Sequence, residues 1–191
     1  VWRPAGDGSS YSEAFTFTSH SEEVTGVCVH PTERFAASVS RDGTWCFLDV
    51  TRGACLMQKG SDDEDPAAAP YSCGRFHPDG LLLAAGTTGG AVRIWDIREQ
   101  KSAANCADHA GSGAVLSLSF SENGYLFASG GEDGSAHIWD LRKLQAVKSL
   151  PTGDGGAVTA VAFDLSGTYL AMGSSKGSVS TTVVKEWTEL T

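Results

Sequence analysis

The sequence is short of basic residues and of long apolar runs, and each shortage excludes a class of protein. Lysine and arginine number 14 against 23 aspartates and glutamates, so the net charge is −9. Chains that bind nucleic acid through its phosphates usually carry a basic surplus, and we therefore expect no direct nucleic-acid contact. The longest obvious apolar run covers residues 81–85, far too short to cross a bilayer, so no membrane partner is expected.

Recognisable metal and phosphate motifs are lacking too. Cysteine occurs five times at irregular positions and never as a C-x-x-C pair: Cys28, Cys46, Cys55, Cys73 and Cys106. This spacing is unlike that of a zinc site and favours reduced structural cysteines. The glycine-rich stretch 86–90 is not followed by Gly-Lys-Ser/Thr, which indicates a hairpin turn and not a phosphate-binding loop. We expect no metal, no cofactor and no catalytic residue.

What the chain does contain is glycine and a repeat. The 23 glycines are scattered along the chain and predict many tight turns between short strands. A Trp-Asp pair ends an alternating strand at Trp139 and again at Trp95, and related residues stand in the same register at Trp2, Leu48 and Thr182. These positions recur roughly every 45 residues, which is typical of the WD-repeat β-propeller, where each repeat forms one four-stranded blade.

The clearest repeat predicts strands over 114–120, 125–129, 135–140 and 145–150, separated by glycine-containing turns. The fold class is therefore all-β, a WD-repeat propeller of about four to five blades within a single partial-propeller domain, residues 1–191. We place blade units at about 1–17, 18–60, 68–105, 109–150 and 154–191. The acidic, proline-containing segment 61–70 is interpreted as a solvated inter-blade loop, with docking of a basic partner as the alternative.

Histidine, serine and aspartate occur together in this repeat, at His109, Ser129 and Asp133, but they do not predict a hydrolase. A nucleophile needs an exposed hydroxyl and an oxyanion hole, whereas these residues are expected between the strands of one blade. With Trp139 they form the structural tetrad of a WD repeat. We predict that the histidine joins the aspartate to the serine, and the serine to the indole N–H, so that each buried polar group is paired.

The other repeats carry this tetrad only in part. The first full repeat keeps His20, Ser38 and Asp42 but has Leu48 where the tryptophan would stand. The remaining repeats depart further from the pattern. We therefore expect these blades to be held together by apolar packing and to be the softer ones.

Several segments resemble one family. Residues 121–144 and 42–56, together with 76–96 and 184–190, are similar to the pre-mRNA-processing factor 19 family of spliceosomal U-box ubiquitin ligases. The stretches 44–47 and 140–144 are the most specific. The resemblance implies a seven-bladed propeller in a nuclear protein that forms a homo-tetramer through a coiled coil. It also implies that the propeller binds splicing-complex components and ubiquitination substrates, while the U-box and coiled coil lie outside this sequence.

Five partial or whole units do not make a closed ring of seven. An open arc exposes apolar blade flanks and strand edges, so we expect the chain to self-associate. Propellers bind partners through the loops on their faces, and the turns between second and third strands offer Arg41, Thr88, Glu132 and Lys176. Each could equally be an ordinary solvated turn residue.

Two other functions compete with a splicing-associated scaffold. One is a generic WD-repeat scaffold of another intracellular complex. The other is a propeller enzyme with its site in the central channel, which the inner strands disfavour because they are nearly bare of carboxylates and histidines.

Overall fold

A computed structural model describes residues 1–4, 6–60, 69–107, 109, 111 and 113–184. Every regular element in this part of the chain is a β-strand, and it contains no helix that is long and apolar enough to span a membrane. The strands are β1 (Trp2–Pro4), β2 (Tyr11–Glu13), β3 (Val24–Val29), β4 (Phe35–Ser40), β5 (Thr44–Asp49), β6 (Ala54–Gly60), β7 (Tyr71–Phe76), β8 (Leu82–Thr87), β9 (Val92–Asp96), β10 (Lys101–Cys106), β11 (Val115–Phe120), β12 (Leu126–Gly131), β13 (Ser135–Asp140), β14 (Gln145–Pro151), β15 (Val158–Phe163), β16 (Tyr169–Ser174) and β17 (Val179–Val183).

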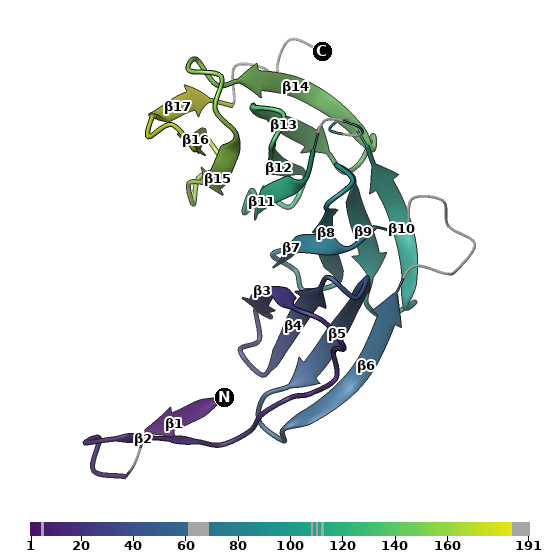
Figure 1. Cartoon of the computed structure of the whole chain (residues 1–191), viewed down its shortest axis with the longest axis vertical. Coiled ribbons are helices and arrows are strands. Elements are labelled where there is room, and N and C mark those ends of the chain that lie inside the picture. Colours follow the sequence, from purple (N-terminus) through teal and green to yellow (C-terminus); the bar gives the residue numbers. More distant parts are fainter. Residues whose placement is uncertain (5, 61–68, 108, 110, 112, 185–191) are drawn as a thin grey trace.

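Four antiparallel meanders follow one another along the chain: β3–β6, β7–β10, β11–β14 and the three-stranded β15–β17. We call them the first to fourth blades. Figure 1 shows them side by side in a curved arc, with the first strand of each blade on the concave side and β6, β10 and β14 on the convex side. The predicted all-β propeller fold is confirmed. The outer part of the last predicted unit, residues 185–191, lies outside the described residues.

The N-terminal residues form a hairpin that stands apart from the four blades. Strands β1 and β2 pair only with each other, at the end of the arc that carries the N-terminus (Figure 1). Trp2, matched in sequence to Trp139, is 65% exposed, whereas Trp139 is 2% exposed. The register match at Trp2 therefore does not extend to burial, because no described sheet packs over this side chain. Of the predicted acidic loop, residues 61–68 also lie outside the described residues.

The core lies between neighbouring blades. Apolar side chains of the first and second blades form one buried cluster, in which the rings of Trp45 and Trp95 lie 5.8 Å apart. A second cluster joins the second blade to the third, and a further one joins the third to the fourth. Because neighbouring sheets bury apolar side chains against each other in this way, the blades stabilise one another by the hydrophobic effect. All five cysteines are free thiols, and Cys28, Cys46 and Cys106 are buried.

Two glycines allow the blades to approach closely. A Cβ atom on Gly86 would lie 2.8 Å from a methyl carbon of Val115 in the next blade. At Gly130, the matching position one blade along, a Cβ would lie 2.5 Å from a methyl carbon of Val158. Neither distance is sterically possible, so a larger residue would push the two sheets apart.

Histidine side chains connect neighbouring blades near the turns between first and second strands. Nε2 of His30 lies 3.0 Å from the carbonyl oxygen of Gly80, and Nε2 of His77 lies 2.8 Å from that of Gly124. In each pair Nε2 must carry the hydrogen, because a carbonyl only accepts. Ser121 stands at the same place in the third blade, and its buried hydroxyl has no hydrogen-bond partner among the described residues. No sequence pattern predicted these contacts between blades.

Hydroxyl groups also join the innermost strands of successive blades. Thr25 Oγ1 donates to the carbonyl of Tyr71 over 2.8 Å, which connects β3 to β7. Between the third and fourth blades, Ser117 and Ser119 accept backbone N–H groups of β15 at 3.1 and 3.0 Å. These bonds satisfy backbone groups on the concave side of the arc.

Candidate protein-interaction surface

The third blade contains a continuous chain of buried hydrogen bonds. Trp139 Nε1 donates to Ser129 Oγ over 2.8 Å, and Ser129 Oγ lies 2.9 Å from His109 Nε2. His109 Nδ1 lies 2.7 Å from Asp133 Oδ2. The structure thus places the four residues of the predicted tetrad in one connected chain, which runs from β13 across β12 to the turn between them.

The chain fixes the direction of each hydrogen bond. Ser129 accepts from the indole and uses its own hydrogen toward His109, so the imidazole carries its hydrogen on Nδ1 and donates it to Asp133. Ser129 is fully buried, and its hydroxyl is engaged on both sides. This geometry suits a structural role and not a nucleophile, which needs access to substrate.

Electrostatics favour the ionised form of the aspartate in this chain. Burial raises the pKa of Asp133, but the backbone N–H of Ser135 and the hydrogen bond from His109 outweigh it, and the pKa lies below its usual value. The carboxylate therefore stays charged at neutral pH and holds both the imidazole and the turn before β13.

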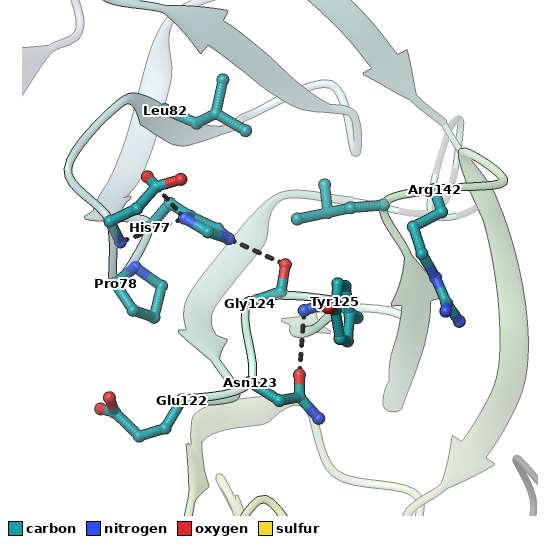
Figure 2. A pocket seen from close by; sticks show the side chains of 10 residues that line it. His77, Pro78, Leu82, Glu122, Asn123, Gly124, Tyr125 and Arg142 are labelled. Atoms are coloured by element: carbon teal, nitrogen blue, oxygen red, sulfur yellow. Dashed lines mark hydrogen bonds and ion pairs between the residues drawn. The ribbon is translucent and has the colours of Figure 1, made fainter.

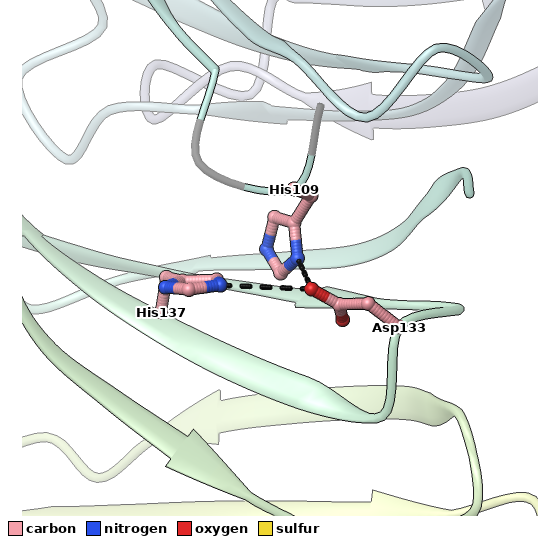
Figure 3. A group of neighbouring side chains, drawn as sticks. All are labelled: His109, Asp133 and His137. Atoms are coloured by element: carbon pink, nitrogen blue, oxygen red, sulfur yellow. Dashed lines mark hydrogen bonds and ion pairs between the residues drawn. The ribbon is translucent and has the colours of Figure 1, made fainter. Parts of the chain in front are cut away.

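A second histidine joins this group. Figure 3 shows His109, Asp133 and His137 gathered at one point. One potential ligand atom from each lies within 4.8 Å of the others. His137 Nε2 lies 3.7 Å from Asp133 Oδ2, and the two imidazole rings meet edge to face at 4.1 Å. His109 Nδ1 carries a hydrogen and donates to Asp133, and Nε2 accepts from Ser129, so this imidazole has no lone pair left for a metal ion. The arrangement fits a buried polar cluster better than a metal centre.

The first blade keeps most of the same chain. His20 Nε2 lies 2.8 Å from Ser38 Oγ, and Nδ1 lies 3.1 Å from Asp42 Oδ2. Thr44 Oγ1 also donates to Asp42, over 2.6 Å. Although burial raises the pKa of Asp42, the hydroxyl and backbone N–H of Thr44, the N–H of Ser21 and the imidazole lower it to about 2. The chain ends at the serine because Leu48 offers no donor.

The other two blades have different polar contacts in place of the tetrad, in addition to the apolar packing that the sequence predicts. In the second blade, which lacks the histidine, Trp95 Nε1 donates to the Tyr71 hydroxyl over 3.2 Å. The indole of this blade is thus satisfied by the first strand and not by the second.

In the fourth blade, the acidic residue and the basic residue stand in the reverse order from the first blade. Asp154 stands four residues before the first strand, as His20 does, and Lys176 stands where the first blade has Asp42. The hydroxyls of Ser174 and Ser178 donate to Asp154 over 2.8 and 2.7 Å, and Lys176 Nζ donates to its carbonyl oxygen over 2.8 Å. The hydroxyl of Ser178 is the main cause that lowers the pKa of Asp154 to about 2.

The four predicted partner-binding residues lie at the same end of their blades, in the turns between second and third strands, but they are held differently. Arg41 Nε forms an exposed ion pair with Glu23, 2.8 Å apart. Glu132 Oε2 accepts a backbone N–H at 3.0 Å, and Thr88 donates its own N–H to the backbone of the preceding loop. Lys176 donates a hydrogen bond to the backbone of Asp154, and it lies one position later in its turn than the other three residues do in theirs. Arg41 and Lys176 are thus both exposed cations of this set, and each has a partner among the described residues.

Comparison with known proteins identifies these repeats. The sequence pattern of the WD domain, G-beta repeat family matches residues 12–49, 67–96, 100–140 and 145–180. The chain belongs to the WD-repeat family.

The aspartates that give WD repeats half of their name begin the turns between third and fourth strands. Asp49 and Asp96 each accept two backbone N–H groups of the turn, at 2.8–3.0 Å. Asp140 accepts one, and its side-chain hydrogen bonds with Arg142 hold its pKa below the usual value.

Individual WD-repeat proteins match over nearly the whole chain. Pre-mRNA-processing factor 19 homolog 2 of Arabidopsis thaliana is 43% identical over 98% of this chain, which spans 34% of that relative. Pre-mRNA-processing factor 19 of Oryza sativa is 40% identical over 92% of the chain and 32% of the relative. The human protein of that name is 38% identical over 96% of the chain and 44% of the relative. The resemblance noted in the motifs is confirmed, and the chain spans about a third of the length of the first two relatives.

Proposed function

We propose that this WD-repeat arc is the partner- and substrate-binding propeller of a ubiquitin ligase that acts in pre-mRNA splicing. The observation that carries the proposal is the 43% identity, over 98% of the chain, to a protein named for pre-mRNA processing. The match extends over nearly the whole arc and so includes the turns, which are where propellers bind partners.

The structure supports a binding module in a second way. The strands are committed to the blades, and the hydrogen-bond chains hold the turns at one face in defined positions. A preorganised surface loses less conformational entropy when a partner binds. We propose splicing-complex components and ubiquitination substrates as partners and the nucleus as the location. The net charge of −9 favours proteins over nucleic acid as ligands.

Catalysis of ubiquitin transfer is proposed for the whole protein and not for this arc. In that proposal a U-box recruits the conjugating enzyme and a coiled coil forms the homo-tetramer, while the propeller supplies recognition. A scaffold of another intracellular complex is the alternative function, because WD repeats alone do not specify which assembly they serve.

Affinity recovery from nuclear extract tests the proposal. The tagged chain is incubated with extract, and the recovered proteins are compared by mass spectrometry with those recovered by an unrelated WD-repeat propeller. We expect enrichment of splicing proteins. Enrichment of trafficking or signalling proteins in their place would overturn the proposed function in favour of the alternative.

A pair of charge reversals tests the choice of face. Arg41→Glu alters an exposed turn residue at the end of the blades that carries the four predicted residues. Arg98→Glu makes the same charge change at an exposed residue in a turn at the opposite end of the second blade. We expect Arg41→Glu to reduce recovery severalfold and Arg98→Glu to leave it unchanged. Equal recovery by both variants would reject this face.

A further inference from the structure

The opposite end of the blades contains a groove that the proposed function does not use. Figure 2 shows its lining, which comes from the turns after β7 and β11 and from the turn between β13 and β14. The groove has a volume of about 670 Å³, within the range of ligand sites in proteins. Pro78, Leu82 and Leu141 supply its apolar surface, and Asp79, Glu122, Tyr125 and Arg142 supply its polar groups.

The framework of this groove is held by one hydrogen bond between two blades and one within a turn. His77 of the second blade donates to the carbonyl of Gly124 in the third, and Asn123 Oδ1 accepts the backbone N–H of Tyr125 at 2.9 Å. Figure 2 shows both bonds next to the Tyr125 ring. The ring therefore stands on a turn that is fixed from two sides, and the groove exists before any ligand arrives.

The ionisable side chains that line the groove give it a net negative charge. Arg142 is the one cation of the lining whose charge does not depend on protonation of an imidazole, and Asp140 neutralises it through two hydrogen bonds of 3.0 and 2.7 Å. The remaining carboxylates are Asp79, which is 48% exposed and lies 2.7 Å from His77 Nδ1, and the exposed Glu122. Phosphate groups would be repelled here, whereas a cation would be attracted.

An exposed aromatic ring completes the site. Tyr125 is a large hydrophobic side chain, and yet it is 53% exposed. The guanidinium of Arg142 lies 4.8 Å from the ring centre, which shows that a cation can occupy the π-face of this ring. The matching positions in the other blades are Arg34, Leu81 and Thr168, so the third blade alone of these four presents an aromatic residue here.

We propose that this groove binds an extended segment of a protein partner through an arginine or lysine side chain. The cation rests against the exposed part of the Tyr125 ring, and its charge is balanced by Glu122 and Asp79. The inference rests on the proposed function as a protein-binding module and adds a second contact surface, with a stated ligand chemistry, to it.

Binding of a defined peptide tests this inference. The 191-residue chain is titrated into a fluorescently labelled peptide of alternating glycine and arginine, and in parallel into the same peptide with glutamine in place of arginine. We expect saturable binding of the arginine peptide that weakens as salt is added, and no binding of the glutamine peptide. Amide NMR signals of residues 122–125 should shift. Equal binding of both peptides, or shifts confined to other residues, would overturn the proposal.

Variants locate the contact within the groove. Glu122→Gln and Tyr125→Leu should each raise the Kd up to about fivefold, the size typical of one exposed ion pair or one cation–π contact. Leucine is the residue of the second blade at this position, so the latter change is compatible with the fold. Glu22→Gln, which removes the charge of an exposed carboxylate just before β3, at the opposite end of the blades, is the matched control.

An unchanged Kd in Glu122→Gln and Tyr125→Leu, or an equal rise in the control, would reject the site. Because the assay uses a synthetic peptide, its outcome is separate from that of recovery in nuclear extract. Splicing proteins recovered by a chain that ignores the arginine peptide would leave the proposed function standing and remove the groove alone.

Discussion

Replacement of Ser129 by alanine tests how much the tetrad stabilises its blade. Among the described residues, this hydroxyl is the only group that forms hydrogen bonds with both His109 and Trp139. In the first blade, Ser38 occupies the same place but has His20 as its only tetrad partner, because the third strand has no tryptophan there. The same substitution in two blades of one molecule therefore differs by one buried partner.

The expected loss in free energy of unfolding follows from the number of buried groups that lose a hydrogen-bond partner. A buried donor or acceptor left without a partner costs about 1–3 kcal/mol. Ser129→Ala leaves both the indole N–H and the imidazole Nε2 without a partner, so we expect the free energy of unfolding to fall by about 2–6 kcal/mol. Ser38→Ala leaves the imidazole of His20 without this partner and no indole, and a loss of about 1–3 kcal/mol is expected. The volume change is the same in both, which cancels most of the packing contribution.

Two measurements check this prediction. Urea unfolding of the chain, followed by far-UV circular dichroism, gives the free energies and shows through the slope whether the transition remains cooperative. Hydrogen exchange of the Trp139 indole N–H reports on the third blade alone and should accelerate only in Ser129→Ala. Equal losses in the two variants, or a change below about 0.5 kcal/mol for Ser129→Ala, would refute the view that the chain of bonds acts as a unit.

Three further predictions concern other parts of the arc. His77→Ala should lower the free energy of unfolding by about 1–3 kcal/mol, because Gly124 loses its inter-blade donor, and an unchanged urea midpoint would contradict this. Glu33 has a φ of 58°, a left-handed conformation that glycine adopts without strain. Glu33→Gly should therefore raise the free energy of unfolding by up to about 1 kcal/mol, seen as a slightly higher thermal midpoint; a lower midpoint would count against it. The pKa of Asp42 is lowered to about 2 in the folded protein, against a value near 4 in the unfolded chain. The ionised carboxylate therefore stabilises the fold at a pH above about 4, and this contribution is lost as the pH falls toward 2. Stability should therefore drop across that window, and Asp42→Asn should make the drop shallower.

Local pattern was sufficient to predict the repeat and the complete tetrad. Alternating apolar residues, glycine turns and the Trp-Asp pairs act within about 45 residues of one another, so each blade is encoded by contiguous sequence. For the same reason the positions of His109, Ser129, Asp133 and Trp139 could be predicted from the repeat register. Their hydrogen bonds run within a single blade.

Contacts between blades were decided only by the tertiary structure. The bond from His77 to Gly124, the donation from Thr25 to Tyr71 and the groove beside Tyr125 each depend on which turns and faces meet when neighbouring sheets pack. No periodicity within one repeat specifies that meeting, because the angle between blades is set by packing of two sheets and the glycines between them. The sequence by itself thus determined what each blade is, and the arc determined what the blades present to a partner.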